Sequence, residues 1–309
     1  MAERIIDAIA LSGWGDVEAV LLPGGFLRLP DPIGHLDETA RREALLSRPM
    51  VRALGELSRR LAGRAGPPFL VVGIDLKPLN RRIGGDQMVA AWRDGELVAL
   101  TRKTFPANGD TDGWGPVYPV YEEDFSSPSR MVVLPRGRRA VLLGCYDAFG
   151  VRGIIHERHA DLTAMRLARD RVNGLHRPSI ALRRYFLARC RALMAAHPPD
   201  LALIAIHNFI RPGADGYWQR HGIAGASAAL GGIPVIGASH FNEALPQDPD
   251  RSPLAAAGVP QTHLDQGGRR EPHAVRPDAS IVLHGRDGSP LAIIRRFDCL
   301  TPSTHERNI

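Results

Sequence analysis

The stretch Ala140-Val-Leu-Leu-Gly-Cys-Tyr-Asp147 decides the fold. Its first four residues form a continuous apolar run, which predicts a strand buried on both faces. Cys145 then follows at the carboxyl end of that strand, where open α/β sheets build their binding sites. Gly144 and Gly150 leave room for a ligand to approach the backbone. A cysteine in this position is more often a small core residue than a nucleophile, so its neighbours must decide its role.

Outward from this strand, predicted strands and helices alternate along most of the chain. Strands are predicted over residues 17–22, 69–75, 87–92, 97–101, 131–134, 140–144, 201–206, 233–237, 279–284 and 291–296. Helices are predicted over residues 2–12, 38–62, 166–197 and 218–230, and residues 242–277 are expected to form a surface excursion. This alternation, with hairpins inserted, predicts an α/β fold with mixed sheets and helices covering their faces.

Composition excludes several classes of protein. Apolar residues make up 44% of the chain and charged residues 23%, which is typical of a globular domain. There is no secretory signal in the charged N-terminus and no apolar run long enough to cross a bilayer, so a cytoplasmic protein is expected. The three scattered cysteines suit a reducing compartment. The net charge of +6 comes from arginines spread among acids, without a nucleic-acid-binding motif, so no nucleic-acid partner is expected.

Three segments together resemble one known family, the nitrilase or carbon–nitrogen hydrolase superfamily. Residues 142–147, Leu-Leu-Gly-Cys-Tyr-Asp, resemble its nucleophile motif. Residues 101–104, Thr-Arg-Lys-Thr, resemble the strand end that carries its lysine. Residues 121–125, Tyr-Glu-Glu-Asp-Phe, resemble the segment that carries a second glutamate. Further matching segments extend from about residue 2 to residue 296, and the order of the motifs is specific although each is short.

The resemblance implies a four-layer α-β-β-α sandwich forming a single domain over residues 1–309. It implies that Cys145 is the nucleophile, Lys103 the cation beside it and Glu122 an active-site carboxylate. It also implies that Tyr146, Asn208 and Phe209 line the substrate pocket. Neither a cofactor nor a metal ion is expected. The protein is expected to form a homodimer or a higher homo-oligomer.

This set of residues makes chemical sense. A thiolate attacks an amide or nitrile carbon and forms a covalent thioester or thioimidate. A neighbouring ammonium stabilises the charge that develops and favours the thiolate. A carboxylate can carry a proton to the leaving amine and later activate water.

The main departure from the family is at position 24. The family's first catalytic glutamate follows the proline that ends its strand, whereas Pro23 is followed here by Gly24 and Gly25. Glu18 lies inside the strand, in the wrong place for a base. Three explanations are open: Glu122 has taken over as base, a different chemistry needs no base, or the protein is a non-catalytic relative.

Other departures concern the ends of motifs and the middle of the chain. The family's first strand has no counterpart before Ala2, because the sequence starts late or because the sheet lacks that strand. After the nucleophile motif the family continues with Phe-Pro-Glu, which is replaced here by residues 148–151. An arginine-rich helical insertion is predicted around residues 160–198.

Histidines supply weaker candidates. His156 and His159 lie three residues apart without an evident third ligand, so no metal site is predicted. His207 and His240 follow apolar strands, and a pocket position and a hydrogen-bonded core position are equally open for both.

The leading hypothesis is therefore a cysteine-dependent hydrolase or amidotransferase acting on a non-peptide amide or a nitrile. The alternative is a catalytically silent relative that binds a ligand or a protein partner in the same pocket.

Overall fold

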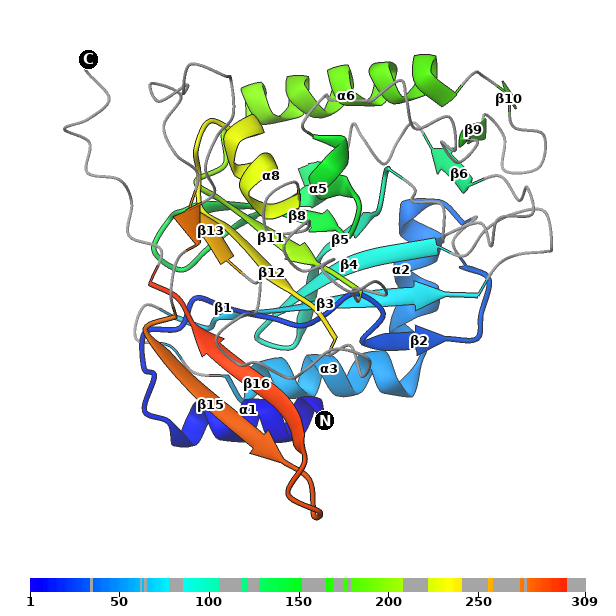
Figure 1. Ribbon diagram of the computed structural model, residues 1–309. Coiled ribbons are helices and arrows are strands. Elements are labelled where there is room, and N and C mark those ends of the chain that lie inside the picture. The colour runs from blue at the N-terminus through cyan, green and yellow to red at the C-terminus, as the bar shows by residue number, and fades with distance from the viewer. Residues whose placement is uncertain are drawn as a thin grey trace.

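The computed structural model describes residues 1–33, 36–61, 63, 66–77, 86–105, 118–121, 128–151, 165–168, 175–176, 179–207, 222–240, 255–257, 273–274 and 277–298. Within these residues the protein has a mixed α/β fold, in which two large sheets lie between two helical layers (Figure 1). The predicted four-layer α-β-β-α architecture is confirmed. No helix in the described part of the chain is long and apolar enough to cross a membrane.

The first sheet is built around one long central strand, β3 (Phe69–Leu76). β1 (Ala19–Leu21) and β2 (Leu27–Leu29) both pair with β3 in parallel. β4 (Asp86–Arg93) follows antiparallel to β3, and β5 (Glu96–Arg102) antiparallel to β4. The strand order β1-β3-β4-β5 places the end of β5, which leads into Lys103, on the far side of the sheet from β1.

The second sheet has the order β14-β13-β12-β11-β8-β7. Its centre is parallel: β8 (Arg139–Gly144) pairs with β11 (Leu201–Ala205), and β11 with β12 (Val235–Ala238). Its flanks are antiparallel and comprise β7 (Met131–Val133), β13 (Ala255–Ala257) and β14 (His273–Ala274). Because β8 and β11 are parallel neighbours, the residues that follow them emerge at the same edge.

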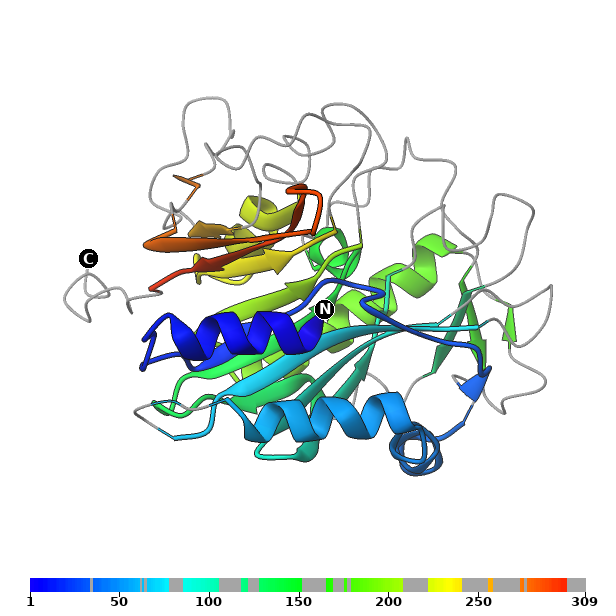
Figure 2. The ribbon, with the colours of Figure 1, turned by 90° about the horizontal axis from the view of Figure 1, so that it is seen from below.

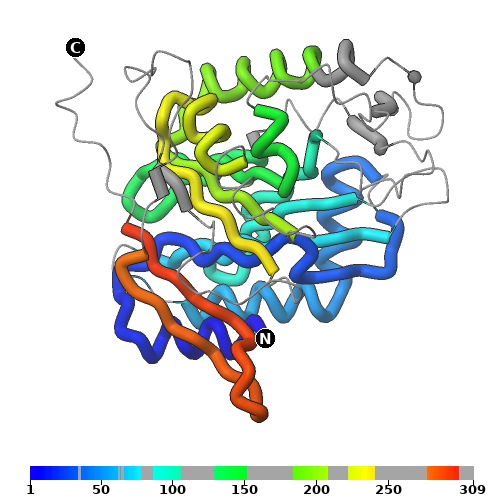
Figure 3. Tube along the Cα trace, viewed as in Figure 1, coloured from blue at the N-terminus to red at the C-terminus, as the bar shows by residue number. Residues whose placement is uncertain are grey.

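The remaining strands of the described residues form two smaller sheets. β6 (Tyr118–Tyr121) pairs with β9 (Met165–Ala168), and β9 with β10 (Leu175–His176). β15 (Ala279–His284) and β16 (Pro290–Arg296) form a hairpin beside α1 (Ala2–Leu11), as Figure 3 shows. Arg4 on that helix donates a hydrogen bond to the carbonyl of His284 over 2.8 Å.

The layers follow from the alternation of side chains along buried strands. In β3, Phe69 and Val71 point into the core between the two sheets, whereas Leu70 and Val72 point toward the helices on the other face. The same alternation in β8 sends Leu142 between the sheets and its neighbours outward. Both faces of these strands are covered, which explains why their sequences are continuously apolar instead of alternating.

The outer layers are helical. α1 and α3 (Pro49–Arg59) lie side by side over the first sheet, seen from below in Figure 2, and Arg60 links them through Glu3 and Asp7. α5 (Asp147–Gly150), α6 (Ser179–Ala196) and α8 (Ala224–Ala229) lie on the outer side of the second sheet (Figure 1).

Two helix predictions were wrong in part. The helix predicted over residues 38–62 is two helices, α2 (Glu38–Leu46) and α3, because Pro49 opens the second one. The helix predicted over residues 166–197 exists only as α6, since β9 and β10 occupy its first half.

Two shorter predictions also changed. The helix predicted over residues 218–230 is observed as α8, and its first four residues lie outside the described ranges. The excursion predicted over residues 242–277 contributes β13 and β14 to the second sheet. A single domain with an insertion around residues 160–198 stays a prediction.

Candidate active site

Cys145 lies where the sequence places it, directly after β8. Its backbone N–H donates to the carbonyl of Ala205 on β11 over 2.8 Å. Its φ is +20°, and among the described non-glycine residues only Asp94, in a tight turn, shares a positive φ. Such backbone conformations are sparsely populated and cluster at functional sites. The thiol is partly exposed, in contrast to that of Cys190.

Lys103 reaches the same place from the other sheet. Its side chain is 1% exposed and packs over Gly144, the residue before the cysteine. A Cβ atom on Gly144 would lie 2.9 Å from Lys103 Cβ, so the close approach requires glycine there. Lys103 Nζ donates to Gln87 Oε1 over 2.7 Å, and its backbone N–H donates to the carbonyl of the same glutamine over 2.7 Å.

A buried carboxylate, Asp147, joins the two strand ends. Its Oδ1 accepts from the backbone N–H groups of Thr104 and Phe105 over 2.8 and 2.9 Å, and its Oδ2 accepts from Gly144 over 3.0 Å. The residues after Lys103 and the residue before Cys145 are thus held by one side chain. Asp147 therefore determines how the lysine and the cysteine lie relative to each other.

Arg130 supplies the counter-charge for Asp147. Its Nη1 lies 3.2 Å from Asp147 Oδ2, and both side chains are almost fully buried. Its Nη2 donates to the carbonyl of Arg102 over 2.7 Å and to Thr104 Oγ1 over 3.0 Å. A buried ion pair is tolerated when such additional hydrogen bonds satisfy it.

A second cluster lies around the two glycines that follow Pro23. A Cβ atom on Gly24 would lie 2.7 Å from His207 Nδ1 and 2.9 Å from the carbonyl of Ala205. A Cβ atom on Gly25, whose φ is +64°, would lie 2.5 Å from Asp75 Oδ2. The double glycine is therefore required by the side chains of His207 and Asp75.

His207 and Asp75 form a hydrogen-bonded pair. His207 Nε2 lies 2.8 Å from Asp75 Oδ1. A carboxylate can only accept, so Nε2 carries the proton and a neutral imidazole has its lone pair on Nδ1. His207 Nδ1 is buried and makes no hydrogen bond of ordinary geometry to a described residue. Burial lowers the pKa of His207, but the hydrogen bond with Asp75, the interaction with the Cys145 thiol and the charges of both outweigh it and raise the pKa to about 9.

His240 supports this second cluster. Its Nε2 lies 2.9 Å from the carbonyl oxygen of Gly24, and its backbone N–H donates to the carbonyl of His207 over 2.8 Å. Burial lowers the pKa of His240, and the positive charge of His207 lowers it further. A carbonyl oxygen can only accept, so His240 donates from Nε2 to Gly24.

Of the predicted residues, the structure places Lys103 over Gly144, the residue directly before Cys145. Tyr146 follows the cysteine, and its ring stacks on Phe149 with centroids 4.6 Å apart. The other three predicted site residues, Glu122, Asn208 and Phe209, lie outside the described residues. Among those described, no group of three or more His, Cys, Asp or Glu side chains could hold a metal ion.

The sequence alone assigned no role to the pair His207 and Asp75. His207 was open between a pocket and a core position, and Asp75 carried no role. The signal that could have found them is the double glycine at positions 24 and 25, which leaves room for large side chains from other strands.

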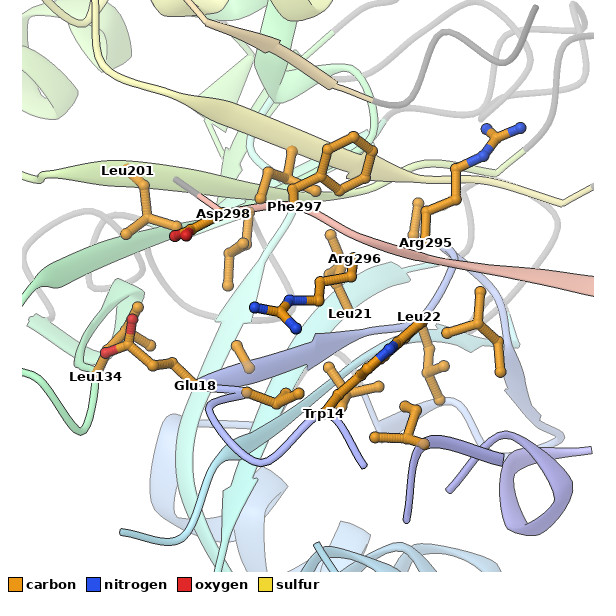
Figure 4. A pocket seen from close by; sticks show the side chains of 18 of the residues that line it. Trp14, Glu18, Leu21, Leu22, Leu134, Leu201, Arg295, Arg296, Phe297 and Asp298 are labelled. Carbon is orange, nitrogen blue, oxygen red and sulfur yellow. The ribbon is translucent and has the colours of Figure 1, made fainter. Parts of the chain in front are cut away.

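A separate cavity of about 210 Å³ lies between β1 and β16 (Figure 4). Trp14, Leu22, Leu201 and Phe297 line it, together with Glu18. Glu18 accepts from the backbone N–H of Arg136 over 2.9 Å and pairs with Arg138, so the expectation that it is no base for Cys145 agrees with its surroundings. Neither the cysteine nor the lysine lines this cavity.

Several solved structures are similar to this chain at low identity. An amidase from Nesterenkonia sp. is 14% identical, with 96% of this chain and 80% of that chain covered and a TM-score of 0.44. A variant of the Nesterenkonia AN1 amidase from the nitrilase superfamily is 14% identical, with 77% and 68% covered and a TM-score of 0.44. The glutamine-dependent NAD+ synthetase from Acinetobacter baumannii is 11% identical over 84% of this chain and 40% of its own, with a TM-score of 0.41. No protein-family model and no curated protein sequence matches. These likenesses are weak, so any functional assignment must rest on the residues of the site.

Proposed function

We propose that this protein is a cysteine-dependent carbon–nitrogen hydrolase of the nitrilase superfamily that acts on a non-peptide amide or a nitrile. The observation that carries the proposal is the packing of buried Lys103 over Gly144, directly before a strained and partly exposed Cys145. A buried cation beside a nucleophile is the arrangement that acyl transfer through a thioester needs.

In the proposed reaction the sulfur of Cys145 attacks the carbonyl carbon of an amide and forms a C–S bond. The carbonyl oxygen becomes negatively charged, and the ammonium of Lys103 stabilises that charge. Cleavage of the C–N bond releases the amine and leaves a thioester, which water hydrolyses to a carboxylic acid and the free thiol. A nitrile would pass through a thioimidate at the same sulfur.

Lysine suits this role because a compact ammonium with rotatable donors can follow the oxygen as its charge grows. The hydrogen bond from Lys103 Nζ to Gln87 Oε1 holds the ammonium at the strand end. Asp147 supports the geometry through its bonds to Thr104 and Gly144. Interactions of this kind with a developing oxyanion contribute about 10²–10³-fold in rate.

The remaining site residues are proposed on the sequence resemblance. Glu122 is proposed as a carboxylate of the same site, and Tyr146, Asn208 and Phe209 as walls of the substrate pocket. A cytoplasmic location and a homodimer or higher homo-oligomer belong to the same proposal. Light scattering on the purified full chain measures the oligomeric state.

The experiment is a survey of small aliphatic and aromatic amides and nitriles with the full-length protein. Ammonia release is measured, and intact mass reports an acyl adduct on the protein. We expect turnover with at least one substrate class and loss of both signals in Cys145→Ser. Cys190→Ala is the matched control, because that thiol is buried and burial raises its pKa to about 11. It should retain activity.

One result would favour the silent alternative. If no substrate releases ammonia or forms an adduct, and Cys145 reacts with iodoacetamide like an ordinary exposed thiol, the hydrolase proposal is wrong.

A further inference from the structure

We infer that His207 is the acid–base catalyst of this site and that Asp75 positions it, so that Cys145, His207 and Asp75 form a catalytic triad in the space left by Gly24. This inference rests on the proposed function. The proposed reaction needs a group that transfers protons, and the proposed function assigns that role to none of the described residues.

The first argument is spatial. A side chain on Gly24 would collide with His207 Nδ1, and one on Gly25 with Asp75. The position at which the superfamily carries a glutamate is thus filled from another strand by an imidazole. The backbone N–H of Gly24 donates to the carbonyl of Ile206 over 2.9 Å, which ties the loop to the strand that carries His207.

The second argument is topological. β8 and β11 are parallel neighbours with Gly144 opposite Ala205. Cys145 follows Gly144 directly, and His207 lies two residues after Ala205, so both emerge at the same sheet edge. Asp75, which lies near the end of β3 in the facing sheet, reaches His207 from the opposite side. Three strands from two sheets therefore converge on one imidazole.

The third argument is chemical. The bond from Nε2 to Asp75 assigns the lone pair of the neutral imidazole to Nδ1. Nδ1 is buried and has no hydrogen bond of ordinary geometry to a described residue, so its lone pair is available to the neighbouring thiol. The thiol of Cys145 interacts with the ring and raises its pKa, as Asp75 does. Nδ1 is therefore the nitrogen available to take the thiol proton.

The charged and titratable groups around the ring come from several elements. Asp75 lies on β3, Cys145 follows β8, and His240 follows β12. Arg28 on β2 lies 4.0 Å from the carboxylate of Asp75 and is largely exposed. Burial opposes a positive charge on His207, whereas the carboxylate of Asp75 and the thiol of Cys145 favour it. The pKa of His207 is raised to about 9, so the effects of Asp75 and Cys145 together are larger than that of burial.

The proton balance is complete. His207 Nδ1 takes the proton of the Cys145 thiol to give the thiolate–imidazolium pair from which the cycle starts, and the thiolate attacks the substrate carbon. The same N–H then protonates the leaving amine as the C–N bond breaks. Nδ1 next takes a proton from the attacking water, and the acid is released as the C–S bond breaks. The released thiolate then lies beside the protonated Nδ1, which restores the starting pair.

The test is the pH dependence of Cys145 alkylation by iodoacetamide, a readout independent of any substrate. Peptide mapping separates Cys145 from Cys190, whose thiol has a pKa of about 11. We expect the wild-type protein to react at pH 6–7 as a thiolate–imidazolium pair, with a further rise near pH 9 when His207 loses its proton. His207→Gln should remove the low-pH limb and lower the rate there by about tenfold or more.

Other variants separate a catalytic from a structural role. Asp75→Asn should keep a two-step profile but move the upper step from about 9 toward the ordinary histidine value, because one favourable charge is lost. His197→Gln, at an exposed histidine after α6, should leave the profile unchanged. Glu122→Gln should retain the alkylation profile, because that profile depends on the pairing of Cys145 with His207. Circular dichroism and thermal melting identify any variant that has lost its fold.

The outcomes are distinct. If His207→Gln and Asp75→Asn, both folded, give the wild-type profile, the triad is wrong. If His207→Gln still hydrolyses amides while Glu122→Gln does not, the hydrolase proposal stands and Glu122 replaces His207 as the base. If the profile depends on His207 but no amide or nitrile is turned over, the Cys145–His207 pair stands and the choice of reaction is wrong.

Discussion

Gly24 has no side chain because His207 occupies the space that one would fill: a Cβ atom there would lie 2.7 Å from the imidazole Nδ1. The two positions are 183 residues apart (207 − 24), and the contact explains a glycine that the sequence alone presents as a loss.

The first prediction concerns this contact. Gly24→Ala should destabilise the protein by about 1–3 kcal/mol, because an added methyl group is forced against a packed ring. The penalty should shrink in the background of His207→Ala, which removes the ring but leaves the carbonyl of Ala205 2.9 Å from the added Cβ atom. Urea unfolding of the four proteins in this double-mutant cycle measures the coupling. Equal penalties in both backgrounds would contradict the contact.

Gly13 provides the control for that cycle. It has a φ of +70° and nothing within 4 Å of an added Cβ atom, so Gly13→Ala introduces backbone strain alone. Its cost should be the same with and without His207.

The second prediction concerns the stability of the protein as a function of pH. The pKa of His207 is raised to about 9 in the folded protein, above its ordinary value of 6.5. His207 therefore binds its proton more tightly in the folded state than in the unfolded state. The resulting contribution to the free energy of unfolding is fully present below pH 6.5 and is lost as the pH rises through 9. The loss should be on the order of 1–3 kcal/mol, since the side chain is 22% exposed and partly screened.

Chemical denaturation at a series of pH values measures this loss. His207→Gln should show a flatter profile between pH 6.5 and 9. A wild-type profile equally flat over that range would contradict the raised pKa.

The third prediction concerns the buried pair Arg130 and Asp147. Asp147→Asn should destabilise the protein by about 3–5 kcal/mol, because it leaves the guanidinium buried without its counter-charge. It should also slow the alkylation of Cys145, since Asp147 holds Gly144. The exposed arginine of a surface pair, Arg60, is the control: Arg60→Ala should cost less than about 1 kcal/mol. Comparable losses in the two variants would contradict the assigned role.

The fourth prediction concerns Lys103. Lys103→Met should lower kcat/KM by at least about 10²-fold without unfolding the protein, because a methionine fills similar space and needs no charged partner. Lys103→Arg should not restore activity, since a planar guanidinium cannot follow the oxyanion in the same way. Steady-state kinetics on the best substrate of the survey provides the measurement. Full activity in Lys103→Met would remove the lysine from the mechanism.

Much of the fold could be predicted from the sequence, because its buried strands are long apolar runs. β3, β8 and β11 were each expected within a residue or two of their observed bounds. The break between α2 and α3 was missed although Pro49 marks it, because the helical periodicity continues past the proline. β9 was missed because its partner, β6, lies far away in the chain and pairing of that kind leaves no local pattern.

The candidate site could likewise be predicted only in part. Cys145 and Lys103 belong to short motifs, so their positions at the ends of β8 and β5 could be predicted, and their catalytic roles stay a proposal. His207 and Asp75 could not be paired, because they follow or end strands in different sheets and meet only when those sheets are packed together. A local pattern records which strand a residue ends, but not which side chain faces it across the core.

The contact between Gly24 and His207 also constrains how this site could change over generations. A glutamate introduced at position 24 while His207 is present meets the ring, and removal of His207 alone leaves the thiol without its partner. A glutamate at position 24 and the imidazole of His207 therefore exclude each other, and under the proposed triad each single exchange should lower activity. Under the proposed triad, a change from one arrangement to the other therefore requires both residues to be exchanged together.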